Sequence, residues 1–270
     1  MAVVVVDDLD DPRLADYRHL REPSVRGRVE RDAGIFTVEG WLSLEALAAS
    51  PYGVRSALVA SQHVARASGL VPPEVPIYSV PEDSLEAVTG VHFHRGVLAV
   101  AERPAPRPPG EVLARARRVL VLEGVNDHEN LGSLFRNAAA FGVDAVLLDP
   151  TTTDPLYRRT TRVSLGHVLR VPFARVGREA WPGFLHELRD SGLAVLALTP
   201  APDAEPMSAV VGHVPERVAI LVGAEGPGLT DAAMAAADRR VRIPMAPGTD
   251  SVNVATAAAI ALASLYERQG

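Results

Sequence analysis

The stretch LVGAEGPGLT at 221–230 joins an apolar run to a cluster of glycines. The glycines are Gly223, Gly226 and Gly228. Glycines at such a position let the backbone approach a ligand closely. Their order is G-x-x-G-x-G, unlike the G-x-G-x-x-G of dinucleotide folds, and no Gly-Lys-Ser/Thr follows as in a P-loop. Glu225 would also repel a phosphate, so the stretch is typical either of a tight turn before a helix capped by Thr230 or of a ligand loop that is not a phosphate cradle.

A single arginine stands in the helical pattern of NLGSLFRNAAAFG, residues 130–142. One face of this predicted helix is apolar, and another carries Arg136 among residues with very small side chains. These neighbours are Gly132, Ala139 and Ala140. Such a strip allows another chain or a ligand to approach closely. Arg136 is therefore either a surface residue paired with Glu129 or Glu123, or a residue that serves a ligand.

A third group lies in VRIPMAPGTDSVNVATAAAIALASLYE, at residues 241–267. A predicted strand ends at Ile243 and Pro244, and a loop leads to Ser251 and Asn253, which are both good capping residues. The helix that follows is rich in alanine. The pattern is typical of a C-terminal helix that docks closely on its neighbours, or of a helix at a dimer interface.

The three groups follow strands in a chain that alternates strand and helix patterns. The predicted strands lie in RRVLVLEGV, DAVLLD, HVLRVPFARV, LAVLALTP, RVAILVGAEG and RRVRIPM. This alternation predicts a parallel sheet with helices on both faces. Ligands bind beyond the carboxyl ends of the strands in such sheets, which is where the three groups lie.

A proline-rich stretch, ERPAPRPPGE at 102–111, predicts a semi-rigid linker. We expect a small α/β domain at 1–101 and a larger one at 112–270. In the first, GIFTVEGWLSLEALAAS predicts a strand that turns at Gly40 into a helix. His92 and His94 there share one strand face, but two ligands without a third nearby make a weak metal site, and we expect no metal.

The composition excludes several kinds of chemistry. The 270 residues contain no cysteine, which excludes disulfides, thiolate zinc sites and a cysteine nucleophile. The net charge of −6 means that a nucleic acid would have to be held by a local basic patch. The first residues lack the basic flank of a signal peptide, and no stretch is long and apolar enough to span a bilayer. We expect a soluble, cytoplasmic protein.

In this order and spacing, the three groups resemble the motifs of the SpoU, or TrmH, family of RNA ribose 2′-O-methyltransferases, which belong to the SPOUT class. The residues that carry the resemblance are Asn130, Gly132 and Arg136 in the first motif, Glu225 and Gly228 in the second, and Ile243, Pro244, Ser251 and Asn253 in the third. Each motif alone is modest. All three at the ends of expected strands are specific.

The resemblance implies a knotted (trefoil) parallel-sheet methyltransferase domain of the α/β class, preceded by a smaller α/β domain that binds substrate RNA. It also implies an obligate homodimer and S-adenosylmethionine as cofactor. A loop with glycines and a carboxylate but no lysine suits this cation without phosphates better than it suits a nucleotide. The expected cofactor-binding residues are Leu198, Thr199, Gly223, Ala224, Gly228, Ile243, Met245, Val252 and Asn253.

The family implies catalytic roles for Arg136 and Asn130. Arg136 either removes the hydroxyl proton or, because the pKa of arginine is above roughly 12, stays charged and stabilises the phosphate and the developing alkoxide. Asn130 is expected to hold its own loop. Glu225 and Ser251 are expected to hold the knot or the partner subunit. The local basic patch expected to bind RNA consists of Arg158, Arg159 and Arg162.

We predict a methyltransferase that acts on a ribose 2′-hydroxyl, with rRNA as the first choice of substrate and tRNA as the second. A protein that keeps the knot but only binds RNA or assists assembly is an alternative, which the presence of Arg136, Asn130 and Asn253 disfavours. A dinucleotide enzyme is a further alternative, which the glycine order disfavours.

Overall fold

The computed structural model describes residues 3–91 and 96–266, so the expectation for His92 and His94 lies outside the described residues. The chain divides into two compact units, of which the first comprises 1–105 and 155–170 and the second 106–154 and 171–270. The segment 155–170 thus packs with the first unit, although in the sequence it connects two strands that belong to the second unit. The two domains expected on either side of the linker at 102–111 therefore differ from these units, because 155–170 was expected in the second domain.

The second unit is built on a seven-stranded sheet in the order β10-β12-β9-β11-β6-β7-β8. Its strands are β6 (Arg118–Glu123), β7 (Ala145–Leu148), β8 (Phe173–Arg175), β9 (Ala194–Leu198), β10 (Glu205–Pro206), β11 (Val218–Gly223) and β12 (Arg239–Arg242). Each of their pairings is parallel. The predicted parallel sheet is confirmed. In HVLRVPFARV only the end forms a strand, because residues 167–169 form a 3₁₀ helix.

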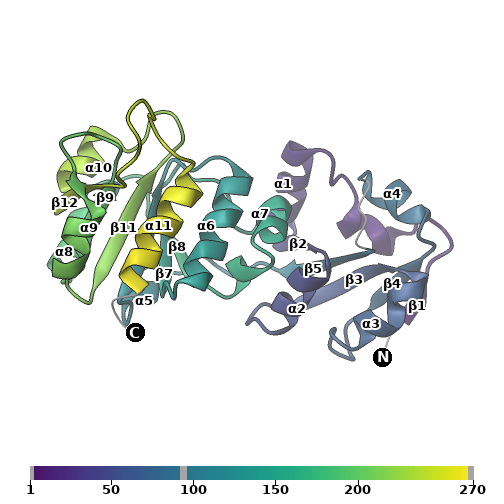
Figure 1. Cartoon of the computed structure of the whole chain (residues 1–270). Coiled ribbons are helices and arrows are strands. Elements are labelled where there is room, and N and C mark those ends of the chain that lie inside the picture. Colours follow the sequence, from purple (N-terminus) through teal and green to yellow (C-terminus); the bar gives the residue numbers. More distant parts are fainter. Residues whose placement is uncertain (1–2, 92–95, 267–270) are drawn as a thin grey trace. The chain divides into compact units, whose positions relative to one another are not determined.

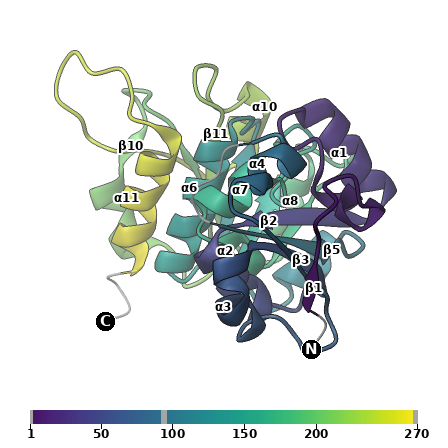
Figure 2. The ribbon, with the colours of Figure 1, turned by 90° about the vertical axis from the view of Figure 1, so that its right-hand side faces the viewer.

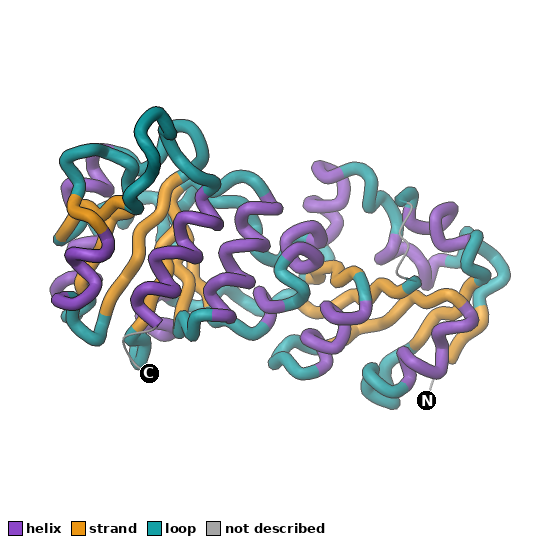
Figure 3. Tube along the Cα trace, in the orientation of Figure 1, coloured by secondary structure: helices purple, strands orange, loops and turns teal. Residues whose placement is uncertain are grey.

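Helices cover both faces of this sheet, as Figures 1 and 3 show. They are α5 (Pro109–Leu113), α6 (His128–Ala140), α8 (Phe184–Asp190), α9 (Met207–Val210), α10 (Asp231–Ala236) and α11 (Val254–Tyr266), with a 3₁₀ turn at Val211–His213. Helices α5, α8 and α10 share one apolar cluster with the sheet. On the other face α6 lies beside α11, which is yellow in Figures 1 and 2.

The strand order gathers four strand ends at one edge of the sheet. Strands β12, β9, β11 and β6 are consecutive neighbours and run parallel, so the residues that follow them leave the same edge. Small side chains let the layers approach, as in the buried face of α11 formed by Ala255, Ala258 and Ala261. The three motifs of the sequence therefore meet here.

The first unit is built on a five-stranded sheet in the order β1-β4-β3-β5-β2. Its strands are β1 (Val3–Val5), β2 (Ile35–Glu39), β3 (Val54–Ala60), β4 (Ile77–Val80) and β5 (Val97–Glu102). Its helices are α1 (Pro23–Asp32), α2 (Trp41–Ala48), α3 (Val64–Ser68), α4 (Ser84–Thr89) and α7 (Arg158–Val163), with 3₁₀ turns at Pro12–Tyr17, Ser61–His63 and His167–Leu169. The predicted turn between β2 and α2 is confirmed at Gly40, whose φ is 88°. No helix among the described residues is long and apolar enough to cross a membrane.

A buried carboxylate fixes the segment 155–170 to the first unit. Glu39, at the end of β2, is 3% exposed and is paired with the guanidinium groups of Arg158 and Arg162. Thr161 donates to the Thr37 carbonyl of the same strand. The pairing gives Arg158 a structural role, since its side chain is only 14% exposed. Arg162 keeps a larger exposed part, and Arg159 is exposed.

Replacing Glu39 by glutamine should therefore destabilise the protein. The substitution leaves the buried Arg158 guanidinium without its anion, and we expect the unfolding midpoint to fall by about 5 °C. Glu45→Gln, which removes an exposed pair with Arg66, is the matched control and should change the midpoint by less than about 2 °C. Differential scanning calorimetry measures both. Equal, small shifts would contradict an anchoring role for Glu39.

Candidate active site

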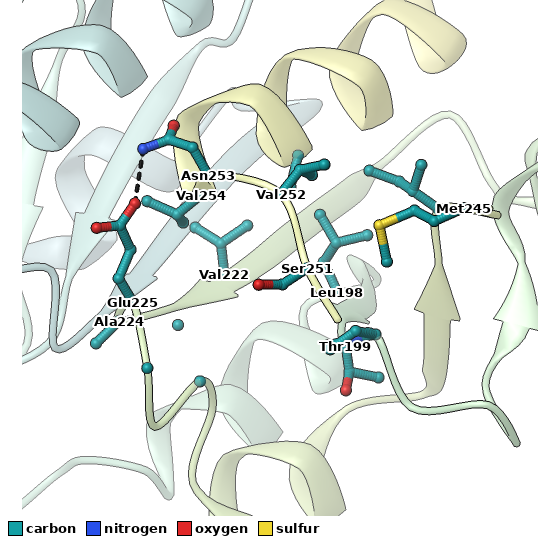
Figure 4. A pocket seen from close by; sticks show the side chains of 16 residues that line it. Leu198, Thr199, Val222, Ala224, Glu225, Met245, Ser251, Val252, Asn253 and Val254 are labelled. Carbon is teal, nitrogen blue, oxygen red and sulfur yellow. Dashed lines mark hydrogen bonds between the residues drawn. The ribbon is translucent and has the colours of Figure 1, made fainter. Parts of the chain in front are cut away.

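A cavity of about 290 Å³ opens at the edge where β9, β11 and β12 end. It is lined by every residue that the sequence predicted to bind a cofactor: Leu198, Thr199, Gly223, Ala224, Gly228, Ile243, Met245, Val252 and Asn253. Glu225 and Ser251 line it as well. Gly226, one of the three glycines singled out in the sequence, lines it too. Sequence reasoning missed Pro200, Val222, Val254 and Ala257, which are neighbours of predicted residues or, for Ala257, lie one helical turn beyond Asn253. Figure 4 shows the side chains of Leu198, Val222 and Val252 in this cavity.

The glycine loop 224–229 folds back onto the end of β11. A Cβ atom on Gly223 would lie 2.3 Å from the backbone carbon of Gly228, so only glycine fits at this position. Gly228 has a φ of 71°, which favours glycine, and its N–H donates to the Ala224 carbonyl at 3.0 Å. The loop is thus a closed turn whose backbone forms one wall of the cavity. Thr230 then caps α10, as predicted, by accepting from the Ala233 N–H.

Asn253 joins the three sequence motifs. Its Nδ2 donates to Oδ1 of Asn130 at 2.7 Å and to Oε1 of Glu225 at 2.6 Å. Its Oδ1 accepts from the N–H groups of Ala255 and Thr256, at 2.9 and 3.2 Å, and so caps α11. Figure 4 shows the Glu225 carboxylate directed at this amide. One side chain therefore fixes the start of α6, the glycine loop and the start of α11 together.

Helix α6 presents Arg136 on its exposed side. The helix begins after Asp127, whose carboxylate accepts from the N–H groups of Glu129 and Asn130. Asn137 ties the middle of the helix to α11 by donating to the Ala255 carbonyl at 2.8 Å. Arg136 makes no hydrogen bond or ion pair with any residue that the structure describes, so the alternative in which Glu129 or Glu123 neutralises it is wrong. Neither Asn130 nor Arg136 lines the cavity.

The loop after β7 is hydrogen-bonded to the segment that precedes α6. Asp149 is buried and accepts from the hydroxyl groups of Thr151 and Thr152. Burial alone would raise the pKa of Asp149, but these hydrogen bonds and two backbone N–H groups outweigh it and lower the pKa. Arg175 donates to three carbonyls of the loop, at 149, 152 and 153, and burial lowers the pKa of its guanidinium. The Thr152 hydroxyl in turn accepts from Val125, just before α6.

The chemistry of the cavity lining disfavours a phosphate as the ligand. The lining contains apolar side chains and backbone groups, with Glu225 as its charged residue and no lysine or arginine. A carboxylate repels an anion and attracts a cation. The lining fits an uncharged ring system attached to a cationic group.

The model of the SpoU rRNA Methylase family matches residues 117–263. The chain belongs to this family. The match covers all three motifs and the whole cavity, so the resemblance seen in the sequence is confirmed. The protein is a methyltransferase, and its α/β fold is that of the family.

Relatives match this methyltransferase over nearly its full length. An uncharacterized tRNA/rRNA methyltransferase of Mycobacterium tuberculosis is 46% identical over 97% of this chain and 90% of its own. A 23S rRNA (guanosine(2553)-2′-O)-methyltransferase of Bacillus subtilis is 29% identical over 94% of this chain and 96% of its own. The crystal structure of an AdoMet-bound rRNA methyltransferase from Sinorhizobium meliloti superposes with a TM-score of 0.82, at 26% identity and 98% coverage of both chains.

The two functions of Asn253 can be separated by substitution. Asn253→Ala removes the cap of α11 and the bridge to Asn130 and Glu225, and should lower the free energy of unfolding by about 1 kcal/mol. Asn253→Ser retains a capping oxygen but loses the bridge, so its stability should stay within about 0.5 kcal/mol of wild type. In both variants amide hydrogen exchange at 224–229 should be faster. Urea unfolding and exchange mass spectrometry measure the two effects. Wild-type exchange rates in the loop would contradict the bridging role.

Proposed function

We propose that this methyltransferase transfers a methyl group from S-adenosylmethionine to a ribose 2′-hydroxyl of ribosomal RNA. The single observation that carries the proposal is the cavity, in which residues of the second and third family motifs meet and which contains no cationic side chain. The names of relatives support the substrate class, since the Bacillus subtilis relative is a 23S rRNA 2′-O-methyltransferase. Transfer RNA is the second choice.

The cavity lining fits S-adenosylmethionine, which supplies a methyl group on a cationic sulfonium when bound. Backbone groups around Gly223 and the side chains of Ile243 and Val252 would hold the adenine ring. Leu198 and Thr199 would complete this apolar wall. Glu225 would lower the electrostatic cost of the positive charge, while its bond to Asn253 holds it in place. The Sinorhizobium meliloti structure, in which AdoMet is bound, supports this assignment.

Arg136 is proposed to bind the RNA phosphate beside the target ribose and to stabilise the oxygen that loses its proton. Its pKa, above roughly 12 for an arginine, keeps it charged at neutral pH. It is exposed and unpaired among the described residues, so its charge is available to an incoming anion. Asn130 acts through Asn253 and is a positioning residue. Arg159 and the exposed part of Arg162, which also pairs with Glu39, would add charge for RNA, whereas Arg158 is largely buried against Glu39.

The reacting groups are proposed to come from two subunits of a homodimer. Helix α6 starts at the cavity edge and runs away from it, so Arg136 lies about 9 Å along the helix axis from Asn130. It does not line the cavity of its own chain. Beside it, Ala139 is half-buried and Ala140 is exposed, and these small side chains would allow a second subunit to approach closely, whereas Gly132 is buried within its own chain. We infer that Arg136 serves the cavity of the partner subunit.

The remaining family properties are proposed on the same basis. The C-terminal segment would form a trefoil knot: after β12 on the far side of β9, the chain returns to place α11 beside α6.

Residues 1–101 would bind substrate RNA. We propose that the protein is cytoplasmic and works without a metal. A role in RNA binding or assembly without catalysis stands as the alternative, and lost cofactor binding would favour it.

Titration calorimetry with S-adenosylmethionine tests the proposal directly. Wild type and Arg136→Ala should bind the cofactor with dissociation constants within about 2-fold, because Arg136 is proposed to contact the RNA and does not line the cavity of its own chain. Methyl transfer to rRNA should fall at least about 100-fold in Arg136→Ala, the scale expected for loss of a charged transition-state contact. If wild type binds RNA but not the cofactor, the enzyme proposal fails and the assembly alternative takes its place.

Mixed dimers test whether the site is shared. Arg136→Ala and Val252→Glu, which blocks the cavity at an exposed lining residue, should each be inactive alone. After subunit exchange, a shared site predicts recovery to about a quarter of wild-type activity, since half of the dimers are mixed and each has one intact site. A mixture of Arg136→Ala with itself is the control. No recovery in an exchanged mixture would place Arg136 and the cavity in one subunit.

A further inference from the structure

Glu123 is a buried carboxylate that the proposed reaction does not use. It ends β6, is 5% exposed, and has no cationic partner among the described residues. Neutral groups surround it instead: Trp181 Nε1 donates to Oε1 at 3.0 Å, the Thr230 hydroxyl donates to Oε1 at 2.9 Å, and the Thr230 N–H donates to Oε2 at 2.8 Å. A buried charge of this kind persists only when its surroundings are fixed to receive it.

The position of Glu123 links it to the glycine loop. In the parallel pairing of β6 and β11, Glu123 is the register partner of Gly223, where the loop begins. The loop ends at Leu229, which is buried in the apolar cluster, and Thr230, which Glu123 holds. Because Asn253 holds Glu225 near the start of the loop, the two contacts fix both of its ends.

A carboxylate suits this position because each of its oxygens only accepts. Glutamine has the same shape, but its NH₂ group would face one of the donors of Trp181 or Thr230. A donor opposed to a donor in a buried site costs more than a missing hydrogen bond. The result would be a displaced Thr230 and a loosened loop, whose backbone lines the cavity at Gly226 and Gly228.

We propose that Glu123 is a positioning residue for cofactor binding, which sets the shape of the glycine loop by fixing Thr230. The inference rests on the proposed function, because it takes the cavity to be the S-adenosylmethionine site. Trp181 has a different role, because its indole donates to Glu123 while its ring packs against the apolar cluster.

Calorimetric titration of S-adenosylmethionine into variants of the full-length protein tests this role. Glu123→Gln should raise the dissociation constant about 10-fold, and Thr230→Val, which removes the hydroxyl but keeps Glu123, should raise it at least about 3-fold. In the double variant the effects should be less than additive, because both substitutions break one contact. Thr230→Ser keeps the hydroxyl and is the matched control, expected within about 2-fold of wild type.

Trp181→Phe separates positioning from general stability. It removes one donor to Glu123 but leaves the Thr230 contacts, so it should lower the unfolding midpoint while changing the dissociation constant less than about 2-fold. Equal binding by wild type and a folded Glu123→Gln would overturn the proposal, and so would a Trp181→Phe variant that loses stability and affinity in parallel. If Glu123→Gln does not fold, unchanged binding by Thr230→Val overturns it. Failure of wild type to bind the cofactor rejects the proposed function itself.

Discussion

Asn253 donates through one amide nitrogen to Asn130 and Glu225, and through its oxygen it caps the last helix. These partners come from segments that are far apart in the sequence, so the contact forms only after β6, β11 and β12 have taken their places in the sheet. The cavity depends on it, because the ends of β9, β11 and β12 and the loops that follow them form its walls, and Asn253 is itself a lining residue. A sheet of parallel strands brings such loops to one edge but does not fix their conformation. The hydrogen bonds of Asn253 fix the conformation of these loops.

In the glycine loop, too, the backbone determines the turn and side-chain contacts fix its position. Gly223 and Gly228 allow the chain to fold back within a distance that no side chain permits. Closure alone leaves the loop free to move as a unit, and its two ends are fixed by Glu225 on Asn253 and by Thr230 on Glu123. Both anchors are uncharged groups paired with a carboxylate. The positive charge near the site is left to Arg136, which stays exposed and is proposed to act on RNA rather than on the cofactor.

Much of this site could be predicted because its signals are local. Apolar runs gave the strand ends, and cap residues such as Thr230 and Asn253 mark helix starts within a few residues. The third family motif then named lining residues that no periodicity could have selected, such as Met245, whereas Leu198 was expected because it ends a predicted strand. The alternative in which Arg136 pairs with Glu129 or Glu123 is wrong: donors from distant segments take Glu123, and Arg136 has no ion pair with any described residue.

For a related reason, the sequence could not predict that 155–170 packs with the first unit. Its basic residues were interpreted as an RNA patch, since charge runs at a surface attract phosphates. The opposing charge is a single glutamate more than 100 positions away, and its burial at the end of β2 depends on the tertiary fold. Sequence patterns that rest on spacing within one element cannot report such long-range pairs. The same holds for Trp181 beside Glu123.

In the proposed reaction the cavity holds the cofactor and Arg136 binds the RNA whose ribose hydroxyl is methylated. The measurement that tests it most directly is mass spectrometry of nucleosides from unmodified rRNA treated with the protein and isotope-labelled S-adenosylmethionine. We expect label in a 2′-O-methylnucleoside, and no label when Arg136→Ala replaces wild type. Label on a base, or an equal yield from Arg136→Ala, would contradict it.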